Sequence, residues 1–119
     1  MSLRFGTDGV RGVANTELTP TYALALGAAV VDAFDAAEVV IGVDTRRSGS
    51  MLAAALSAGV ASAGADAVEL EVIPTPVVAR EAWVRGVPGV MVSASHNPFG
   101  DNGLKVFGPS GQKLSDAEQ

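Results

Sequence analysis

The order of apolar segments constrains the fold of this chain more than any other feature. Glu38–Asp44 (EVVIGVD) and Val90–Val92 (VMV) are short, apolar and rich in β-branched residues, as is typical of buried strands of a parallel sheet. Alanine-rich stretches separate such segments. Strands that alternate with helices predict an α/β fold in which helices cover a mainly parallel sheet as three α/β/α layers.

Three helices are predicted from their start and stop residues. Thr19 is placed to cap the first helix, with Pro20 at its first position, where the missing N–H costs nothing. Ser48 or Ser50 is expected to cap the second helix, and Gly64 to end it in a left-handed conformation. The predicted ranges are 20–34, 51–63 and 76–85.

Two further features bear on the sheet: one segment is expected near its edge, and a terminal hairpin is expected to make it mixed. Residues 68–72 alternate apolar and acidic side chains, which predicts a strand with one wetter face near the edge of the sheet. Leu104–Phe107 and Gln112–Leu114 flank a Gly-Pro-Ser-Gly turn and are expected to form a hairpin. Ser115 and Glu118 then form a capping box, so a helix is expected to begin where this sequence stops, as in a truncated chain.

Length and charge limit the classes of function. The 119 residues allow one modest core, so we expect a single domain spanning 1–119. A net charge of −5 disfavours binding to nucleic acid or to an anionic membrane. No apolar stretch approaches the roughly 20 residues that span a bilayer. The absence of cysteine fits a cytoplasmic enzyme and excludes a thiol nucleophile.

The densest group of reactive side chains follows the apolar segment 90–92. Ser93, Ser95, His96 and Asn97 supply hydroxyl, imidazole and amide groups in close succession. They are followed by a second polar cluster that consists of Asp101, Asn102 and Lys105. Polar groups at the end of a buried strand are typical of a binding or catalytic loop.

Two other segments carry polar residues in patterns of lower specificity. Residues 4–15 (RFGTDGVRGVAN) are rich in glycine and place Asp8 near Arg11, which favours an ion pair within a loop. Asp44 and Arg46 follow the predicted strand 38–44 in the pattern Gly-x-Asp-x-Arg-x-Ser. At the end of a strand they either support a site or form a surface turn, and the residues alone do not decide between the two.

Together these three segments resemble the α-D-phosphohexomutase superfamily. Its serine loop reads small-Ala-Ser-His-Asn-Pro followed by Asp-x-Asn-Gly-x-Lys or a close variant, and residues 93–98 and 101–105 match it. The opening Phe-Gly-Thr-Asp-Gly-x-Arg-Gly and the Gly-x-Asp-x-Arg-x-Ser pattern are also similar. Among the branches of the superfamily, the loop is most similar to that of the phosphoglucosamine mutases. The resemblance implies the first domain of a phosphohexomutase, with a mixed, mainly parallel sheet.

The resemblance also implies roles for individual residues. Ser95 matches the serine that carries a phosphoryl group between the 6- and 1-positions of a hexose phosphate through a bisphosphate intermediate. Arg11 matches the arginine that meets the phosphoryl group, and Lys105 the lysine near the reacting oxygens. His96, the only histidine, is expected to position groups by hydrogen bonding, with catalytic contact as the alternative. The supporting residues are Asn97, Asp44, Arg46, Asp101 and Asn102.

The metal implied by the resemblance is Mg²⁺. In the family one phosphoserine oxygen and three aspartates of an Asp-x-Asp-x-Asp segment in the second domain hold it, and this chain has no such segment. Ser95, through its phosphate, is expected to supply one ligand, and the remaining domains of a longer polypeptide the others. The 119-residue piece alone is therefore expected to be inactive.

Several alternatives remain open on the sequence. The sugar is expected to be glucosamine phosphate, with a phosphomannomutase or phosphoglucomutase of the same superfamily as the alternative. A phosphosugar-binding module in which Ser95 is never phosphorylated is a second alternative. A serine hydrolase is a poor match, because the single histidine is adjacent to Ser95 and no Gly-x-Ser-x-Gly elbow is present.

Overall fold

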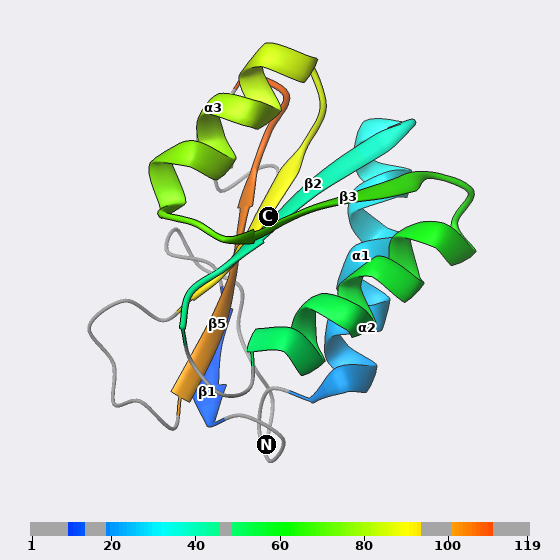
Figure 1. Cartoon of the computed structure of the whole chain (residues 1–119). Helices are drawn as coiled ribbons and strands as arrows, with labels where there is room; N and C mark the ends of the chain where they lie inside the picture. Colours follow the sequence, from blue (N-terminus) through cyan, green and yellow to red (C-terminus); the bar gives the residue numbers. More distant parts are fainter. Residues whose placement is uncertain (1–9, 14–18, 46–48, 94–100, 111–119) are drawn as a thin grey trace.

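A computed structural model describes residues 10–13, 19–45, 49–93 and 101–110 of the chain. Five strands and three helices lie within these ranges and alternate for most of the chain (Figure 1). In chain order they are β1 Val10–Val13, α1 Pro20–Phe34, β2 Glu38–Val43, α2 Gly49–Ser62, β3 Asp66–Val72, α3 Thr75–Arg85, β4 Gly89–Val92 and β5 Asp101–Phe107.

The strands form one sheet in the order β1-β5-β4-β2-β3. β2 pairs in parallel with both β3 and β4, whereas β5 pairs antiparallel with both β4 and β1. Because β5 alone runs against the others, four of the five strands share one direction. The mixed, mainly parallel sheet predicted from the sequence is confirmed.

Helices cover both faces of the sheet, which gives the three predicted layers. α1 and α2 lie side by side on one face and α3 lies on the other (Figure 1). Alternate residues of the central strands face opposite ways, so that Val90 and Val92 pack under α1 and α2, while Met91 packs under α3. Two separate apolar cores therefore hold the layers together.

The helix ends agree closely with the capping residues. The Thr19 Oγ1 atom accepts a hydrogen bond from the Tyr22 N–H at 3.1 Å, and α1 spans the predicted range. α3 begins at Thr75, one residue before the prediction, with Pro74 as its N-cap and left-handed Gly86 as its C-cap.

The second helix begins earlier than predicted. α2 starts at Gly49, so Ser50 lies within its first turn and the prediction of Ser50 as the cap is wrong. The alternative cap, Ser48, lies outside the described residues. Gly64 has a φ of +93°, as expected of a residue that ends a helix in the left-handed region.

β3 is an edge strand, as predicted, and its pairing with β2 is irregular. Ile41 pairs with Glu69 but Val43 pairs with Val72, so β3 carries one extra residue in this interval and bulges. Glu71 sits in the bulge with a φ of +66°, a conformation that is costly for a residue with a side chain.

β5 is longer than expected because residues 101–103, predicted as loop, pair with β1. The predicted hairpin partner 112–114 and the capping box at Ser115 lie outside the described residues. Within the described residues, no helix is long and apolar enough to cross a bilayer.

Close contact between α1 and α2 depends on two glycines. A Cβ atom added at Gly59 would overlap the Leu24 carbonyl oxygen of α1, and one added at Gly27 would overlap the Leu56 carbonyl oxygen of α2. Both contacts involve backbone atoms, which cannot rotate away. The two helices can approach this closely only because neither position carries a side chain.

We predict that Gly59→Ala lowers the free energy of unfolding by about 1–3 kcal/mol, because α1 and α2 must move apart. Gly49→Ala is the matched control, since a Cβ there would meet nothing closer than 3.5 Å. Urea denaturation of both variants measures the difference, and equal stabilities would show that the helices separate without cost.

We predict the opposite sign for Glu71→Gly. Glycine adopts a φ of +66° without steric cost, so the variant should be more stable by roughly 1 kcal/mol. Glu69→Gly, at a neighbouring strand position outside the left-handed region, should be destabilised. Thermal denaturation of the two variants compares them, and a loss of stability in both would contradict strain at Glu71.

Candidate functional site

The carboxyl ends of β2 and β4 lie side by side at one end of the sheet, which we call its carboxyl edge. Val43 pairs with Val92 at the last position of both strands, and the chain leaves them through Asp44 and Ser93. The Asp44 N–H donates a hydrogen bond to the Val92 carbonyl oxygen at 3.2 Å. Two of the three polar segments therefore begin side by side, as expected for the ligand-binding edge of an open α/β sheet.

The serine loop is closed at its base by the first residues of β5. The Ser93 N–H donates a hydrogen bond to the Gly103 carbonyl oxygen at 2.9 Å, and Val92 pairs with Leu104. Ser93 and Gly103, which lie on either side of the segment 94–100 in the sequence, are thus held together close to Asp44. Ser95, His96 and Asn97 belong to this segment and lie outside the described residues, as does Arg46.

β1 brings the third polar segment to the same place. Arg11 pairs with Gly103, Gly12 with Asn102 and Val13 with Asp101. Arg11, far from the serine loop in sequence, therefore occupies a backbone position next to the strand that leaves the loop. Asp8, its alternative ion-pair partner, lies outside the described residues.

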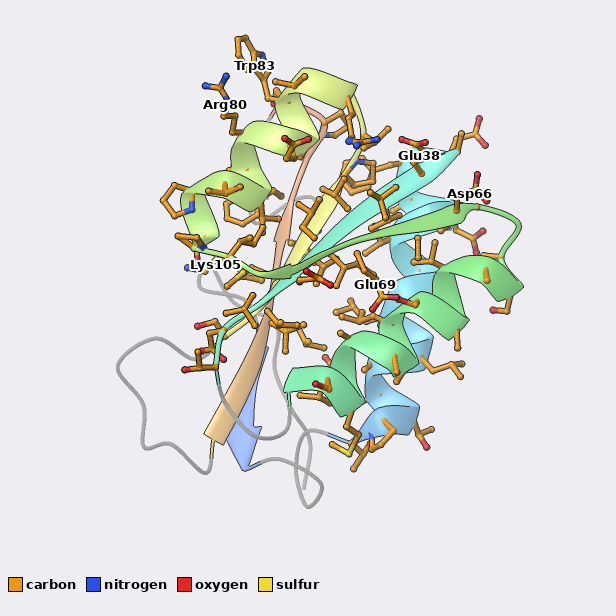
Figure 2. All side chains as sticks on the ribbon, in the orientation of Figure 1. Glu38, Asp66, Glu69, Arg80, Trp83 and Lys105 are labelled. Atoms are coloured by element: carbon orange, nitrogen blue, oxygen red, sulfur yellow. The ribbon has the colours of Figure 1, made fainter. Side chains whose placement is uncertain are left out.

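Lys105 lies two positions along β5 from Gly103 and pairs with Met91. Its neighbours Leu104 and Val106 are buried under α1 and α2, so Lys105 is on the α3 side of the sheet and is partly buried (Figure 2). Paired residues share a face, and so do residues two apart on a strand. The backbone register therefore assigns the Arg11 and Lys105 positions to the same face of the sheet.

Comparison with known proteins identifies this arrangement. A sequence model described as "Phosphoglucomutase/phosphomannomutase, alpha/beta/alpha domain I" matches residues 2–119. The chain belongs to the phosphoglucomutase/phosphomannomutase family. The three polar segments that meet at the sheet edge are those that carry the resemblance to the superfamily in the sequence.

Curated relatives and solved structures agree with this membership. Phosphoglucosamine mutase of Lysinibacillus sphaericus is 52% identical over 125 residues, an alignment that covers 100% of this chain and 28% of the relative. Phosphoglucosamine mutase of Deinococcus radiodurans is 54% identical over 121 residues, covering 97% and 27%. A solved structure from Thermus thermophilus, described as a phosphomannomutase, superposes with a TM-score of 0.86 at 33% identity and covers 99% of this chain and 29% of that one.

The chain therefore spans little more than a quarter of the length of the curated relatives that it matches. The family model covers the chain from residue 2 and carries the name of a first domain. Members of the family thus share this α/β/α unit, and their chains extend well beyond it.

The described residues of this family member do not form a metal site. No group of three or more His, Asp or Glu side chains is close enough to hold a metal ion within the described ranges. Asp44 is partly buried at the sheet edge, a position that suits either a supporting role or a turn, and its role stays a prediction. Isolated carboxylates are a poor match for the several oxygen ligands that Mg²⁺ requires.

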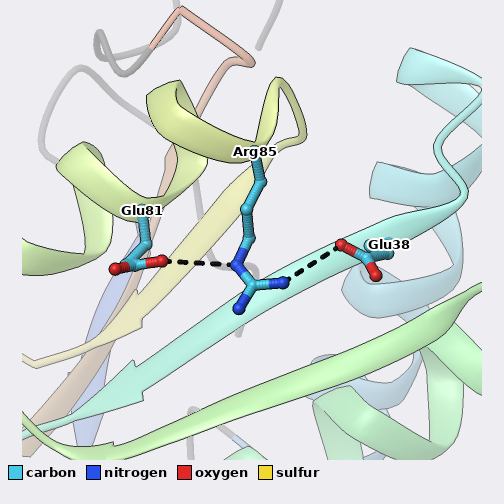
Figure 3. A network of polar contacts seen from close by, with 3 residues as sticks. All are labelled: Glu38, Glu81 and Arg85. Carbon is cyan, nitrogen blue, oxygen red and sulfur yellow. Dashed lines mark hydrogen bonds and ion pairs between the residues drawn. The ribbon is translucent and has the colours of Figure 1, made fainter.

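An ion-pair cluster of Arg85, Glu81 and Glu38 lies at the opposite end of β2 and has a structural role. Arg85 of α3 donates from Nε to Glu81 at 3.3 Å and from a terminal nitrogen to Glu38, the first residue of β2, at 3.5 Å (Figure 3). All three side chains are more than a third exposed, so each pair contributes at most about 1 kcal/mol. The cluster fastens α3 to the sheet far from the carboxyl edge.

Two features of the site region were not predicted from the sequence. One is the pairing of β1 with β5, which places Arg11 beside the loop exit. The other is a groove beside β3. The local pattern contains no signal for either, because both depend on contacts between segments that are distant in sequence. The nearest available signal was the strand-like composition around Arg11, which predicts a strand but not its partner.

Proposed function

We propose that this chain is the catalytic-serine domain of a phosphohexomutase, and that the hexose is glucosamine phosphate. The observation that carries the proposal is that Asp44, β1 and Ser93, from which the serine loop starts, lie together at one end of the sheet, in a member of this family. The identity of 52–54% with phosphoglucosamine mutases over nearly the whole chain favours glucosamine over the other hexoses.

In the proposed reaction, phosphorylated Ser95 donates its phosphoryl group to a free hydroxyl of the hexose phosphate. The serine Oγ–P bond breaks while a P–O bond to the sugar forms; the hydroxyl proton passes to a nearby base, and the released serine Oγ takes up a proton. In the second step the other phosphoryl group of the bisphosphate is transferred to Ser95: its P–O bond to the sugar breaks, a bond to Oγ forms, and the serine proton is passed on to the freed sugar oxygen. Phosphoserine suits this exchange because the ester is stable until positioned cations stabilise the transition state.

The chain offers two cationic side chains for this purpose. Arg11 is proposed to donate two parallel hydrogen bonds to phosphoryl oxygens, which its planar guanidinium does better than an ammonium group. Lys105, on the same face of the sheet by register, is proposed to neutralise charge on the transferred group or to move a proton. His96, Asn97, Arg46, Asp101 and Asn102 are proposed to hold the loop in position.

A magnesium ion would supply further charge neutralisation when bound. The described carboxylates do not fit such an ion, so we propose that this chain contributes only the Ser95 phosphate as a ligand. The other ligands, and the groups that recognise the sugar, are proposed to lie in the rest of a longer polypeptide. The 119-residue piece alone should then show no turnover.

Two alternatives differ in what they require. The similarity to the Thermus protein keeps a phosphomannomutase or phosphoglucomutase as a candidate, at a lower identity of 33%. A phosphosugar-binding module would keep the same strand ends, but its Ser95 would never be phosphorylated.

A cytoplasmic location remains part of the proposal and depends on the absence of cysteine.

We predict that Ser95→Ala in the full-length protein abolishes mutase activity on glucosamine 6-phosphate and removes one phosphate from its intact mass, because no carrier hydroxyl remains. Ser110→Ala, at an exposed position in the turn after β5, is the matched control and should change neither. A full-length protein that never carries phosphate at Ser95 and turns over normally as Ser95→Ala would refute the enzyme proposal.

We predict that Lys105→Met in the full-length protein lowers kcat about 10²–10³-fold, the usual loss when a positioned charge at a developing anion is removed. Methionine keeps the aliphatic length of the partly buried stem, so the melting temperature should change little. Arg80→Met, which removes an exposed cation of α3, is the control and should keep full activity (Figure 2). Equal kcat values in both variants would place Lys105 outside the chemistry.

A further inference from the structure

A groove of about 600 Å³ lies between the outer strand β3 and the first half of α2. Two glutamates and one serine stand among the apolar side chains of its walls, and polar and apolar atoms contribute equally to its surface. The lining residues that carry the argument below are Val43, Ser50, Glu69, Glu71 and Val72.

Position links the groove to the candidate site. Val43, which lines the groove, is the last residue of β2 and directly precedes Asp44. Ser50, on the opposite wall, lies in the first turn of α2, where the chain returns from the site edge. Anything that fills the groove therefore lies directly beside the carboxyl edge.

The groove exposes both apolar and acidic side chains. Val72, the last residue of β3, lines it and is 60% exposed. Glu69 is exposed on the α2 side of β3 (Figure 2). Glu71 is also exposed, and among the described residues neither glutamate forms an ion pair. Exposed apolar side chains beside these two carboxylates suit a partner that presents apolar and basic side chains.

Two occupants are disfavoured by the same residues. The bulge and the left-handed Glu71 interrupt the regular edge of β3, which prevents an added strand from pairing continuously along it. A second copy of the chain, placed by a two-fold axis at this edge, would bring its own Glu69 and Glu71 against these two. Four carboxylates would then face one another without compensation.

We propose that the groove between β3 and α2 receives a basic segment from the remainder of the same polypeptide, whose Lys or Arg side chains face Glu69 and Glu71. The relatives are more than three times as long as this chain, so most of such a polypeptide lies outside the structure. The inference rests on the proposed function, which already requires other domains. The contact fixes a neighbouring domain directly beside the serine loop.

The test uses thiol labelling of the full-length protein, because residues 1–119 contain no cysteine. Val72→Cys places a thiol in the groove, and Asp32→Cys places a control thiol at an exposed position near the end of α1 that leads into β2. Reaction with a polyethylene glycol maleimide is followed on gels against the unsubstituted protein. We expect the groove thiol to react about tenfold or more slowly than the control, and equally fast after denaturation.

A second variant tests the charge. Glu69→Lys with Glu71→Lys in the Val72→Cys background should restore fast labelling, whereas Glu38→Lys, at the far end of β2, should not. Equal labelling of Val72→Cys and Asp32→Cys would overturn the proposal. Protection that disappears on dilution would also overturn it, in favour of a second copy. Labelling needs no turnover, so failure of the mutase proposal and failure of this one are read separately.

Discussion

Two backbone hydrogen bonds at the carboxyl edge of the sheet join β2, β4 and β5 beside the candidate site. The bond from Asp44 to Val92 fixes the exit of β2 against β4, and the bond from Ser93 to Gly103 fixes the exit of β4 against β5. These contacts use only main-chain atoms, so they hold regardless of the side chains that the loops carry. A rigid base of this kind allows a loop rich in polar groups to be presented without a core of its own.

The layers behind that edge depend on small residues. Gly27 and Gly59 let α1 and α2 approach until backbone meets backbone, and the pair covers one face of the sheet. On the other face, a Cβ at Gly42 would lie 2.5 Å from the Val78 side chain, so α3 packs directly on β2 at that point. Tight packing on both faces keeps the sheet from shifting, and with it the relative position of its strand ends.

The sequence predicted those elements whose signals are local. Thr19 with Pro20 marked the start of α1, Gly64 marked the end of α2, and the apolar run of β2 was identified as a buried strand. It did not predict the start of α2, because Ser50 has the chemistry of a cap but lies one residue inside the helix. The local preference of a residue for the cap position does not determine at which residue the first hydrogen bond of the helix forms.

The pairing of β1 with β5 was not predicted for a different reason. Neither Arg11 nor Gly103 carries a local signal for the other, since strand pairing is decided by the whole sheet. The conformation of Glu71 could not be predicted from its residue type, because it has a positive φ, which favours glycine over a residue with a β-carbon.

The register of β5 determines which chemistry the sheet can present. Leu104 and Val106 are buried against α1 and α2, and this burial selects the face to which Lys105 belongs. A slip of one residue would move the lysine into the apolar core and expose a leucine or a valine in its place. Burying an unpaired ammonium group costs several kcal/mol, so the slipped pairing is strongly disfavoured. The same hydrophobic pattern that stabilises the fold therefore keeps Lys105 on the face of the sheet to which the register also assigns the Arg11 position.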